Sequence, residues 1–366
     1  MKKIKLQYPW RFSNCSYYKF LLKDLPKEIK YIEGENTKTV YGRSISYEIT
    51  HYLREYIKRF IGIFCPWLPN IRHTKKGNYD LIHCAHCISS NKSPWICDTE
   101  FVGQFWISGN YSKNPSKRFV RKYVNSEYCK KILAWSEWAK EGILREFPDL
   151  KEKVDVLYPG IPYPKLKKNK KDKKIRLLYV AREFYTKGGG YAIDIMDKMT
   201  KKYNNVEAVM ISRVPDIIKR KYSGNKKITI HELVPQDKLF REVYPNADIF
   251  IYPSFTDTFG FALTEALSYG LPVVTVSGQS RKEIIEDGKT GYVVNFPEDF
   301  DWQNIEKNNP EIVENLTNRV EKLIEDKKTR ELMGKKARKV IKNGKFSMKK
   351  RNEKLIEVID GIFKTH

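Results

Sequence analysis

The sequence predicts an α/β protein with two doubly wound domains and a helical carboxyl-terminal tail. Three observations support this. The chain has 366 residues, enough for two domains of ordinary size that each bury a core. Short apolar runs alternate with segments of helix length in both halves, which is the pattern of strands joined by crossover helices. The alternation is interrupted once, by a proline-flanked stretch rich in lysine.

Six apolar runs of the amino-terminal half are expected to form the strands of the first sheet. They cover residues 3–8, 29–32, 81–84, 95–97, 131–135 and 154–158. We assign residues 1–162 to the first domain and residues 163–174 to a linker. Seven lysines in this linker surround a single acid, Asp172, so the segment repels itself and stays extended.

The same pattern restarts after the linker, in a second domain predicted over residues 175–345. Its expected strands cover residues 175–180, 206–212, 228–231, 249–252, 273–276 and 292–294. From about residue 304 the chain is helical, with apolar side chains at helical spacing. One stripe contains Ile312, Leu316, Val320 and Leu323, and another contains Leu332, Ala337 and Ile341. The last segment, residues 346–366, is read as a helix that is able to pack back on the first domain.

The chain is strongly basic, with 69 Lys and Arg against 44 Asp and Glu and a formal net charge of +25. This balance favours an anionic partner, such as a nucleic acid, an acidic membrane face or a phosphorylated substrate. The alternative is a lysine-rich, solvated surface without a specific partner. The basic residues are dispersed outside the linker and match no nucleic-acid-binding module, so we expect no specific nucleic acid.

The six cysteines all lie in the first half and have no regular spacing, which favours free thiols in a reducing compartment. The amino terminus lacks the apolar core of a signal peptide. No run approaches the roughly 20 apolar residues that span a bilayer. These features predict a cytoplasmic protein.

The most informative stretch is residues 253–274. It follows a buried strand, crosses a short polar loop, and restarts as a helix at about Phe259 that Gly270 ends. Asp257 falls in the loop and Glu265 lies inside the helix. Both acids are therefore expected at the carboxyl edge of a sheet, where open α/β sheets bind ligands. The helix amino terminus there suits a phosphate group.

A second loop, residues 181–190, follows the strand at 175–180 and carries Arg182, Lys187 and three glycines from Gly188 on. The glycines let the backbone approach a ligand closely. Two cations at a sheet edge are able to neutralise a diphosphate. The alternative is an ordinary solvated glycine-rich loop.

Residues 249–276 resemble the signature of family 4 glycosyltransferases, which are retaining enzymes of the GT-B fold. In that pattern a proline-serine strand end precedes an acid, seven residues, a glutamate and a glycine-proline-valine exit. The resemblance extends to residues 178–188, to residues 286–291 and to the tail around Met333 and Ala337. It implies two Rossmann-like domains that face a cleft, with the donor bound by the carboxyl-terminal domain.

The resemblance also implies roles for individual residues. Arg182 and Lys187 would bind the donor diphosphate, Glu265 the ribose, and Asp257 the donor sugar. The backbone amides of Phe259 and Gly260 would face sugar and phosphate, and Gly188 and Phe261 are further donor-binding candidates. Two positions depart from the family pattern. Asp257 stands where a glutamate is usual, and Ala181 stands where glycine commonly precedes the arginine.

The amino-terminal half matches the family less well. The glycine pair that often follows the first strand is missing from residues 9–14. Candidate acceptor or sugar contacts lie at strand ends, namely His83, His86, Asp98, Glu100 and Ser136. Three of them have a structural alternative, which is a core position for the two histidines and a helix N-cap for Ser136. No second ligand cluster accompanies residues 83–87, so no metal site is expected.

Residues 49–68 combine aromatic and aliphatic side chains with Arg54, Lys58 and Arg59. Such a helix is able to lie on an anionic membrane and reach a lipid-linked acceptor. The alternative is a helix packed on the sheet. A peripheral position on the inner face of the membrane is one expectation for this cytoplasmic protein.

The resemblance implies a transferase that moves a sugar from a nucleotide-diphosphate sugar to a glycan, a lipid-linked molecule or another hydroxyl acceptor. Retention of anomeric configuration and hexosyl transfer are expected, without metal or cofactor, in polysaccharide or glycolipid biosynthesis. The alternatives are another GT-B enzyme, such as a nucleotide-sugar epimerase or a phosphorylase, and a basic nucleic-acid-binding protein.

Overall fold

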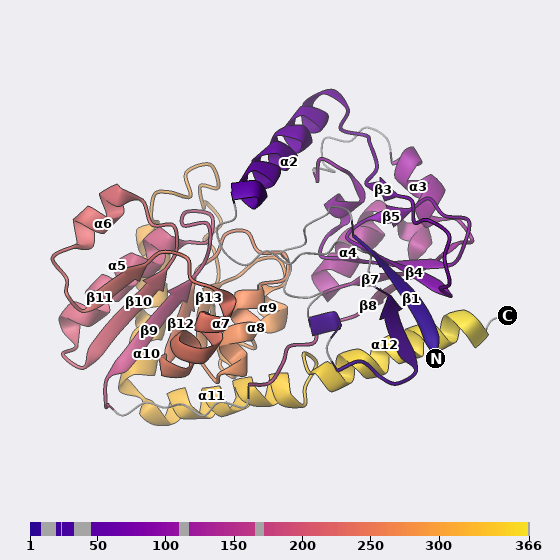
Figure 1. The fold of residues 1–366 in the computed structure, drawn as a ribbon. Coiled ribbons are helices and arrows are strands. Elements are labelled where there is room, and N and C mark those ends of the chain that lie inside the picture. The colour runs from indigo at the N-terminus through magenta and orange to yellow at the C-terminus, as the bar shows by residue number, and fades with distance from the viewer. Residues whose placement is uncertain (9–19, 23, 33–44, 110–116, 165–171, 365–366) are drawn as a thin grey trace. The chain divides into compact units, whose positions relative to one another are not determined.

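The computed structural model describes residues 1–8, 20–22, 24–32, 45–109, 117–164 and 172–364 (Figure 1). Two compact units are present. Unit 1 contains Met1–Gly160 together with Met348–His366, and unit 2 contains Ile161–Ser347. The segment 9–14, where the family's glycine pair was sought, lies outside the described residues, as does most of the predicted linker.

Unit 1 is built on a six-stranded parallel sheet with the order β2-β1-β4-β6-β7-β8. Its strands are β1 (Lys2–Gln7), β2 (Ile29–Ile32), β4 (Leu81–Ala85), β6 (Trp95–Thr99), β7 (Cys129–Ala134) and β8 (Val154–Val156). Every residue of β4 and β6 is buried, because the sheet is covered on both faces. A short parallel pair, β3 (Ile71–Arg72) and β5 (Ile88–Ser89), stands beside this sheet.

The helices of unit 1 are α2 (Ile45–Phe64), α3 (Arg118–Val124), α4 (Glu137–Glu146) and α12 (Met348–Lys364), with 3-10 turns at Val102–Phe105 and Pro148–Leu150. Helix α12 belongs to unit 1 although it ends the chain. Its Arg351 is 1% exposed and donates from Nη2 to the Phe20 carbonyl at 3.0 Å. The last helix is therefore anchored by a buried cation as well as by its apolar face.

Unit 2 repeats the architecture with the strand order β11-β10-β9-β12-β13-β14, again all parallel. Its strands are β9 (Ile175–Val180), β10 (Val206–Ile211), β11 (Ile228–His231), β12 (Ile249–Tyr252), β13 (Val273–Val276) and β14 (Gly291–Val294). In chain order within the unit this reads 3-2-1-4-5-6. The direction of winding reverses between β9 and β12, and open α/β sheets bind ligands at such a point.

The helices of unit 2 are α5 (Gly189–Lys202), α6 (Asp216–Tyr222), α7 (Gln236–Lys238), α8 (Phe261–Ser268), α9 (Arg281–Ile284), α10 (Pro310–Glu325) and α11 (Lys327–Lys342), with a π turn at Leu239–Val243 and a 3-10 turn at Tyr244–Asn246. The predicted stripe on α10 is buried throughout. On α11 the prediction is wrong for Leu332, which is 50% exposed. Met333, four residues before Ala337, is buried in its place because it lies on the same helix face.

All twelve strands predicted for the two sheets are present, with ends displaced by at most two residues. The α/β fold with two Rossmann-like domains and a helical tail is therefore confirmed. The two-residue strands β3 and β5 were missed because they are too short to carry a periodic pattern. Helix α8 begins two residues later than predicted, because Gly260 before it has a left-handed φ of 80°.

Candidate active site

The loops that follow β9 and β12 are tied together at the carboxyl edge of the unit 2 sheet. The Phe255 amide donates to the Thr186 carbonyl at 3.1 Å. Gly188 makes the close approach possible, because a Cβ at this position would lie 2.0 Å from the Pro253 carbonyl oxygen. Its φ of 71° is also in the left-handed region that favours glycine. The glycine predicted to face the ligand thus has a packing role as well.

Lys187 and Asp257 meet across these two loops. The Lys187 ammonium lies 3.3 Å from Asp257 Oδ2 and also donates to the Thr256 carbonyl. The two side chains are 23% and 17% exposed, so the pair lies at the surface without being fully solvated. The structure therefore brings together two residues that the sequence placed 70 positions apart.

Arg182 lies on the same loop as Lys187 and is exposed. Within the described residues, no ion pair with Arg182 is seen. Arg182 and Lys187 thus place two cations on one loop at the edge of the sheet. Helix α8 begins nearby with Gly260 as its N-cap, and glycine has no side chain with which to cap the helix. This combination suits a diphosphate.

Asp257 is fixed from two further directions. The Tyr252 hydroxyl donates to Oδ2 at 2.6 Å, and the Asp257 amide donates to Gln279 Oε1. Burial raises the pKa of Tyr252 well above its ordinary value, and the neighbouring Asp257 charge adds to the rise. Tyr252 therefore stays a hydrogen-bond donor to the carboxylate at all ordinary pH values.

Glu265 is held inside unit 2, with only 7% of its surface exposed. Oε1 accepts from Gln236 Nε2 at 3.0 Å, and Oε2 accepts from the Tyr244 hydroxyl at 2.9 Å. Burial raises the pKa of Glu265 to about 7, although both hydrogen bonds act in the opposite direction. Sequence reasoning missed Gln236 and Tyr244, because the segment that carries them has no motif.

Sequence reasoning also missed Arg281, which is 1% exposed at the start of α9. Its guanidinium donates from Nε to the Val276 carbonyl at 3.0 Å and from Nη2 to the Ser277 carbonyl at 2.7 Å. Burial lowers the pKa of Arg281 to about 10, so it remains charged at neutral pH. A charged side chain among carbonyls at the site edge is a signal that appears only once the fold is known.

Phe259 and Phe261 bracket Gly260 at the start of α8. Phe259 is 1% exposed, and its ring lies 4.9 Å from that of Phe261 and 5.9 Å from that of Phe346. The Ser280 hydroxyl donates to the Phe259 carbonyl at 3.1 Å. The Phe259 side chain is thus part of the core.

In unit 1 the strand ends of β4 and β6 place two histidines beside two acids. His83 and Asp98 are both fully buried, with His83 Nε2 at 3.2 Å from Asp98 Oδ2. His83 Nδ1 also bonds the Tyr31 hydroxyl at 2.7 Å. Because the His83 side chain is fully buried, an acceptor would reach it only after local opening.

His86 and Glu100 lie nearer the surface, with side chains 16% and 22% exposed and His86 Nε2 at 3.6 Å from Glu100 Oε1. His86 has a φ of 54°, which is uncommon for a residue with a side chain and is often found at functional sites. Its ring lies 4.6 Å from that of Trp135. Of the predicted acceptor contacts, this pair is the better placed to meet a ligand.

Ser136 accepts the Ala139 amide at 3.1 Å and is 1% exposed, so it is the N-cap of α4. This is the structural alternative considered for it. Among the described residues, no group of three or more His, Cys, Asp and Glu side chains is placed to hold a metal ion.

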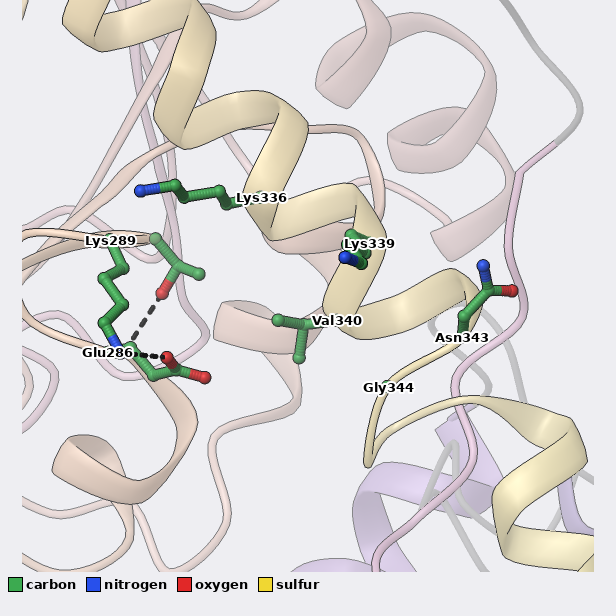
Figure 2. Close-up of a pocket in the computed structure, with 8 residues that line it drawn as sticks. Glu286, Lys289, Lys336, Lys339, Val340, Asn343 and Gly344 are labelled. Carbon is green, nitrogen blue, oxygen red and sulfur yellow. Dashed lines mark hydrogen bonds and ion pairs between the residues drawn. The ribbon is translucent and has the colours of Figure 1, made fainter.

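Figure 2 shows a cavity of about 310 Å³ in unit 2, between the loop before β14 and the end of α11. Because this loop precedes its strand, it lies at the sheet edge opposite the loops after β9 and β12. Lys289 is paired with Glu286 at 3.3 Å, and in Figure 2 the Lys289 and Lys336 side chains do not converge. The cavity contains none of the predicted site residues and is separate from the candidate site.

Comparison with known proteins identifies the carboxyl-terminal half. Residues 164–340 match the family described as glycosyl transferases group 1. An uncharacterized glycosyltransferase of Methanocaldococcus jannaschii is 25% identical over 308 residues, which are 76% of this chain and 75% of that protein. A probable sucrose-phosphate synthase of Thermosipho melanesiensis is 25% identical over 209 residues, half of this chain and 48% of that protein.

The solved structure of sucrose-phosphate synthase from Thermosynechococcus elongatus superimposes with a TM-score of 0.65 at 14% identity, over 100% of both chains. At this identity the likeness establishes the fold alone. The family match covers nearly all of unit 2, including Lys187, Asp257 and Glu265. Residues 164–340 therefore form a glycosyltransferase group 1 domain, in a chain that has the GT-B fold.

Proposed function

We propose that this protein transfers a hexosyl group from a nucleoside-diphosphate sugar to a hydroxyl acceptor with retention of anomeric configuration. Unit 2 binds the donor and unit 1 the acceptor. The observation that carries the proposal is the Lys187–Asp257 pair beside exposed Arg182, at the point where the unit 2 sheet reverses its winding. A sugar diphosphate needs cations at the phosphates and a carboxylate at the sugar hydroxyls, and this edge offers both.

In the proposed reaction the bond between the sugar C1 and the diphosphate oxygen breaks, and a new bond forms between C1 and the acceptor oxygen on the same face. The departing phosphate takes the acceptor proton, so no protein base is assigned. Lys187, Arg182 and the first amides of α8 stabilise the negative charge that develops on the leaving diphosphate. These groups take the place of a metal ion in the proposal, and Glu265 holds the ribose hydroxyls.

A thermal-shift screen with UDP-glucose, UDP-N-acetylglucosamine and GDP-mannose tests donor binding. A ligand at 100 times its Kd stabilises the folded protein by about 2.7 kcal/mol, which is a visible shift. Lys187→Met removes one cation without adding polarity and is expected to weaken UDP binding about tenfold. Lys289→Met, at the opposite edge of the same sheet, is the matched control. Equal effects of the two substitutions would contradict the site assignment.

Product analysis separates transfer from the alternative chemistries. With a labelled donor, release of the free nucleoside diphosphate that requires an acceptor supports transfer. Conversion of one nucleotide-sugar to another without an acceptor would instead indicate an epimerase. Proton NMR of the product measures the anomeric coupling constant, and an inverted anomer would contradict the retaining mechanism.

We also propose that helix α2 attaches the enzyme to an anionic membrane and so brings it to a lipid-linked acceptor. Large apolar side chains lie exposed along its described part, including Tyr56 at 71%, Phe60 at 54% and Ile63 at 73%. Packing on the sheet, the alternative considered for this helix, does not account for them. Lys58 and Arg59 on the same helix and the net charge of +25 favour an anionic surface. No helix among the described residues is long and apolar enough to cross a membrane.

Co-sedimentation with phosphatidylglycerol vesicles tests this attachment. The double substitution Phe60→Ser with Ile63→Ser is expected to lower binding at least tenfold, because each side chain contributes about 1.5–3 kcal/mol when fully buried in an apolar phase. Ile217→Ser with Leu332→Ser is the matched control, since these side chains are 65% and 50% exposed in unit 2. Equal binding to neutral phosphatidylcholine vesicles, or equal losses in both double variants, would contradict the proposal.

A further inference from the structure

The turn after β13 has an unusual backbone that brings one side chain to Asp257. Gly278 and Gln279 have φ values of 111° and 46°, so two successive residues are in the region that side chains rarely adopt. Position 279 carries a glutamine side chain although its φ favours glycine. Its Oε1 accepts the Asp257 amide and also accepts from Arg281 Nη1 at 3.2 Å. A backbone outlier of this kind warrants a search for the contact that it serves.

Arg281 holds the Gln279 side chain through a hydrogen bond and is itself held by backbone carbonyls. Its guanidinium donates to the carbonyls of Val276 and Ser277, and its Nη2 lies 3.5 Å from the Phe255 carbonyl in the loop after β12. The buried cation is thus stabilised by carbonyl dipoles. Gly278 leaves the space that the guanidinium fills, because a Cβ there would lie 2.5 Å from Nη2. Gly278, Gln279 and Arg281 therefore form one cluster in the turn after β13, and this cluster contacts the loop after β12 at Phe255 and Asp257.

We propose that Gln279, held by Arg281, is a positioning residue that sets where Asp257 meets the donor sugar. This inference rests on the proposed function. Tyr252 and Lys187 restrain the Asp257 carboxylate, whereas Gln279 restrains its backbone amide. Both restraints are needed, since a displacement of about 1 Å at a reacting group costs on the order of a hundredfold in rate.

The length of the Asp257 side chain makes its backbone position important. Aspartate reaches one methylene less far than the glutamate usual at this position, so it has less freedom to correct a misplaced backbone. Gln279 should therefore act on the sugar part of the donor, which Asp257 contacts, and leave the nucleoside diphosphate part unaffected. A residue that merely stabilises the loop would affect both parts equally.

The variant Gln279→Gly tests this distinction. Glycine adopts the left-handed φ without strain, so the midpoint of thermal unfolding is expected to stay the same or rise. The Kd for UDP or GDP, whichever binds the wild type, should change less than twofold. The Kd for the matching nucleotide-sugar should rise about tenfold, and kcat should fall on the order of ten- to a hundredfold. Hydrogen exchange at the Asp257 amide should accelerate in the unliganded variant.

Two further variants complete the experiment. Gln279→Glu keeps the oxygen that accepts the Asp257 amide, so it should restore slow amide exchange and recover part of the sugar affinity. Arg281→Lys keeps the charge but loses the fork that holds Gln279, and should reproduce the selective loss of sugar affinity together with a lower unfolding midpoint. If Arg281→Lys does not fold, the two Gln279 variants decide the question alone.

The outcomes separate this inference from the proposed function. If Gln279→Gly binds and turns over the nucleotide-sugar like the wild type, the inference is wrong and the proposed function stands. Parallel losses of UDP and nucleotide-sugar affinity with a lower unfolding midpoint would also overturn it, in favour of a loop staple. If the wild type binds neither a nucleoside diphosphate nor a nucleotide-sugar, the proposed function is wrong and the inference falls with it.

Discussion

The two units have the same kind of parallel sheet, but the carboxyl edges of their central strands differ in how polar groups are exposed. In unit 2 the Lys187 and Asp257 side chains are 23% and 17% exposed, beside exposed Arg182. In unit 1 the corresponding edge holds His83 and Asp98, both at 0%. The polar pair of unit 2 is therefore open to a ligand, whereas the polar pair of unit 1 is enclosed within the protein.

This difference shows that the position of a polar residue at a strand end does not by itself make it part of a site. In both units the polar side chains lie at the ends of the strands, because the strands themselves are buried on both faces and are mostly apolar. Unit 2 combines that placement with glycines that allow close approach of two loops. In unit 1 His83 and Asp98 face each other inside the protein, and His83 also bonds the Tyr31 hydroxyl, whereas His86 and Glu100 are partly exposed.

The largest effect expected from this comparison is that of Glu265→Ala on donor binding. Two ribose hydrogen bonds to a carboxylate contribute about 1.5–3 kcal/mol each, so the Kd for the nucleoside diphosphate should rise on the order of a thousandfold. Isothermal titration measures this change. Glu286→Ala, at the opposite edge of the same sheet, is the control and should leave binding unchanged. If the Glu265→Ala protein folds and still binds the nucleoside diphosphate normally, the assignment of the donor site to unit 2 is wrong.

A somewhat smaller effect is expected for Asp98→Ala in unit 1, and it should act on stability alone. The substitution leaves the buried His83 without its carboxylate, which costs about 3 kcal/mol in free energy of unfolding. Tryptophan fluorescence during urea unfolding reports it, because six of the seven tryptophans lie in the unit 1 sequence. The affinity for the nucleoside diphosphate should not change.

Asp155→Ala is the matched control for this substitution. Asp155 lies on β8 of the same sheet, 31% exposed, and pairs with Lys131 at 2.8 Å. Exposed pairs of this kind contribute up to about 1 kcal/mol. If Asp98→Ala abolishes donor binding and leaves the urea midpoint unchanged, the proposed difference between the two sheet edges is wrong, because the buried pair of unit 1 would then act on binding.

The raised pKa of Glu265 predicts opposite pH dependences for stability and for donor binding. Its pKa is about 7 in the folded protein and 4.5 ordinarily, so the unfolded chain loses the proton first as the pH rises. The stability that the group contributes is fully present below about pH 4.5 and is lost as the pH rises through about 7. The free energy of unfolding of Glu265→Gln relative to the wild type should grow by about 3 kcal/mol between pH 4.5 and 8.

In the proposed binding mode the ionised Glu265 carboxylate accepts from the ribose hydroxyls, so donor binding should strengthen as the pH rises through about 7. Titrations of the wild type with UDP or GDP between pH 5.5 and 8.5 measure this, with Glu265→Gln as the reference that lacks the carboxylate. A wild-type affinity that does not change over this range would show that Glu265 is ionised in the unliganded site, or that it does not bind the ribose.

The fold and the charged residues of the motifs could be predicted from the sequence. Strands such as β9, β11, β12 and β13 were predicted with their observed ends, because each is an apolar run bounded by polar or turn residues. Lys187 and Asp257 were predicted to belong to one donor site, because both follow predicted strands and the family resemblance assigns both to the donor; the structure places them 3.3 Å apart.

What the sequence did not reveal are the residues that hold the charged ones. Tyr244 and Gln236 contact Glu265, and Arg281 and Gln279 contact the loop of Asp257, yet none of the four lies in a recognisable pattern. Their roles depend on long-range packing that local periodicity does not encode. For His83 and Asp98 the strand end was predictable from the sequence, but their burial was not, because burial depends on the layers that cover the sheet.

The smallest predicted effects compare a glycine from each unit. Gly188→Ala in unit 2 places a Cβ 2.0 Å from the Pro253 carbonyl at a φ of 71°, and should cost about 2 kcal/mol in free energy of unfolding and weaken donor binding. Gly142→Ala in unit 1 adds a Cβ that meets nothing within 4 Å in the interior of α4. It should stabilise the protein by up to about 1 kcal/mol and leave donor binding unchanged, because alanine loses less backbone entropy in a helix. Urea unfolding and UDP titration of both variants measure the contrast. A Gly188→Ala protein with unchanged stability would mean that the loops after β9 and β12 separate freely, and that the open edge of unit 2 is not preorganised.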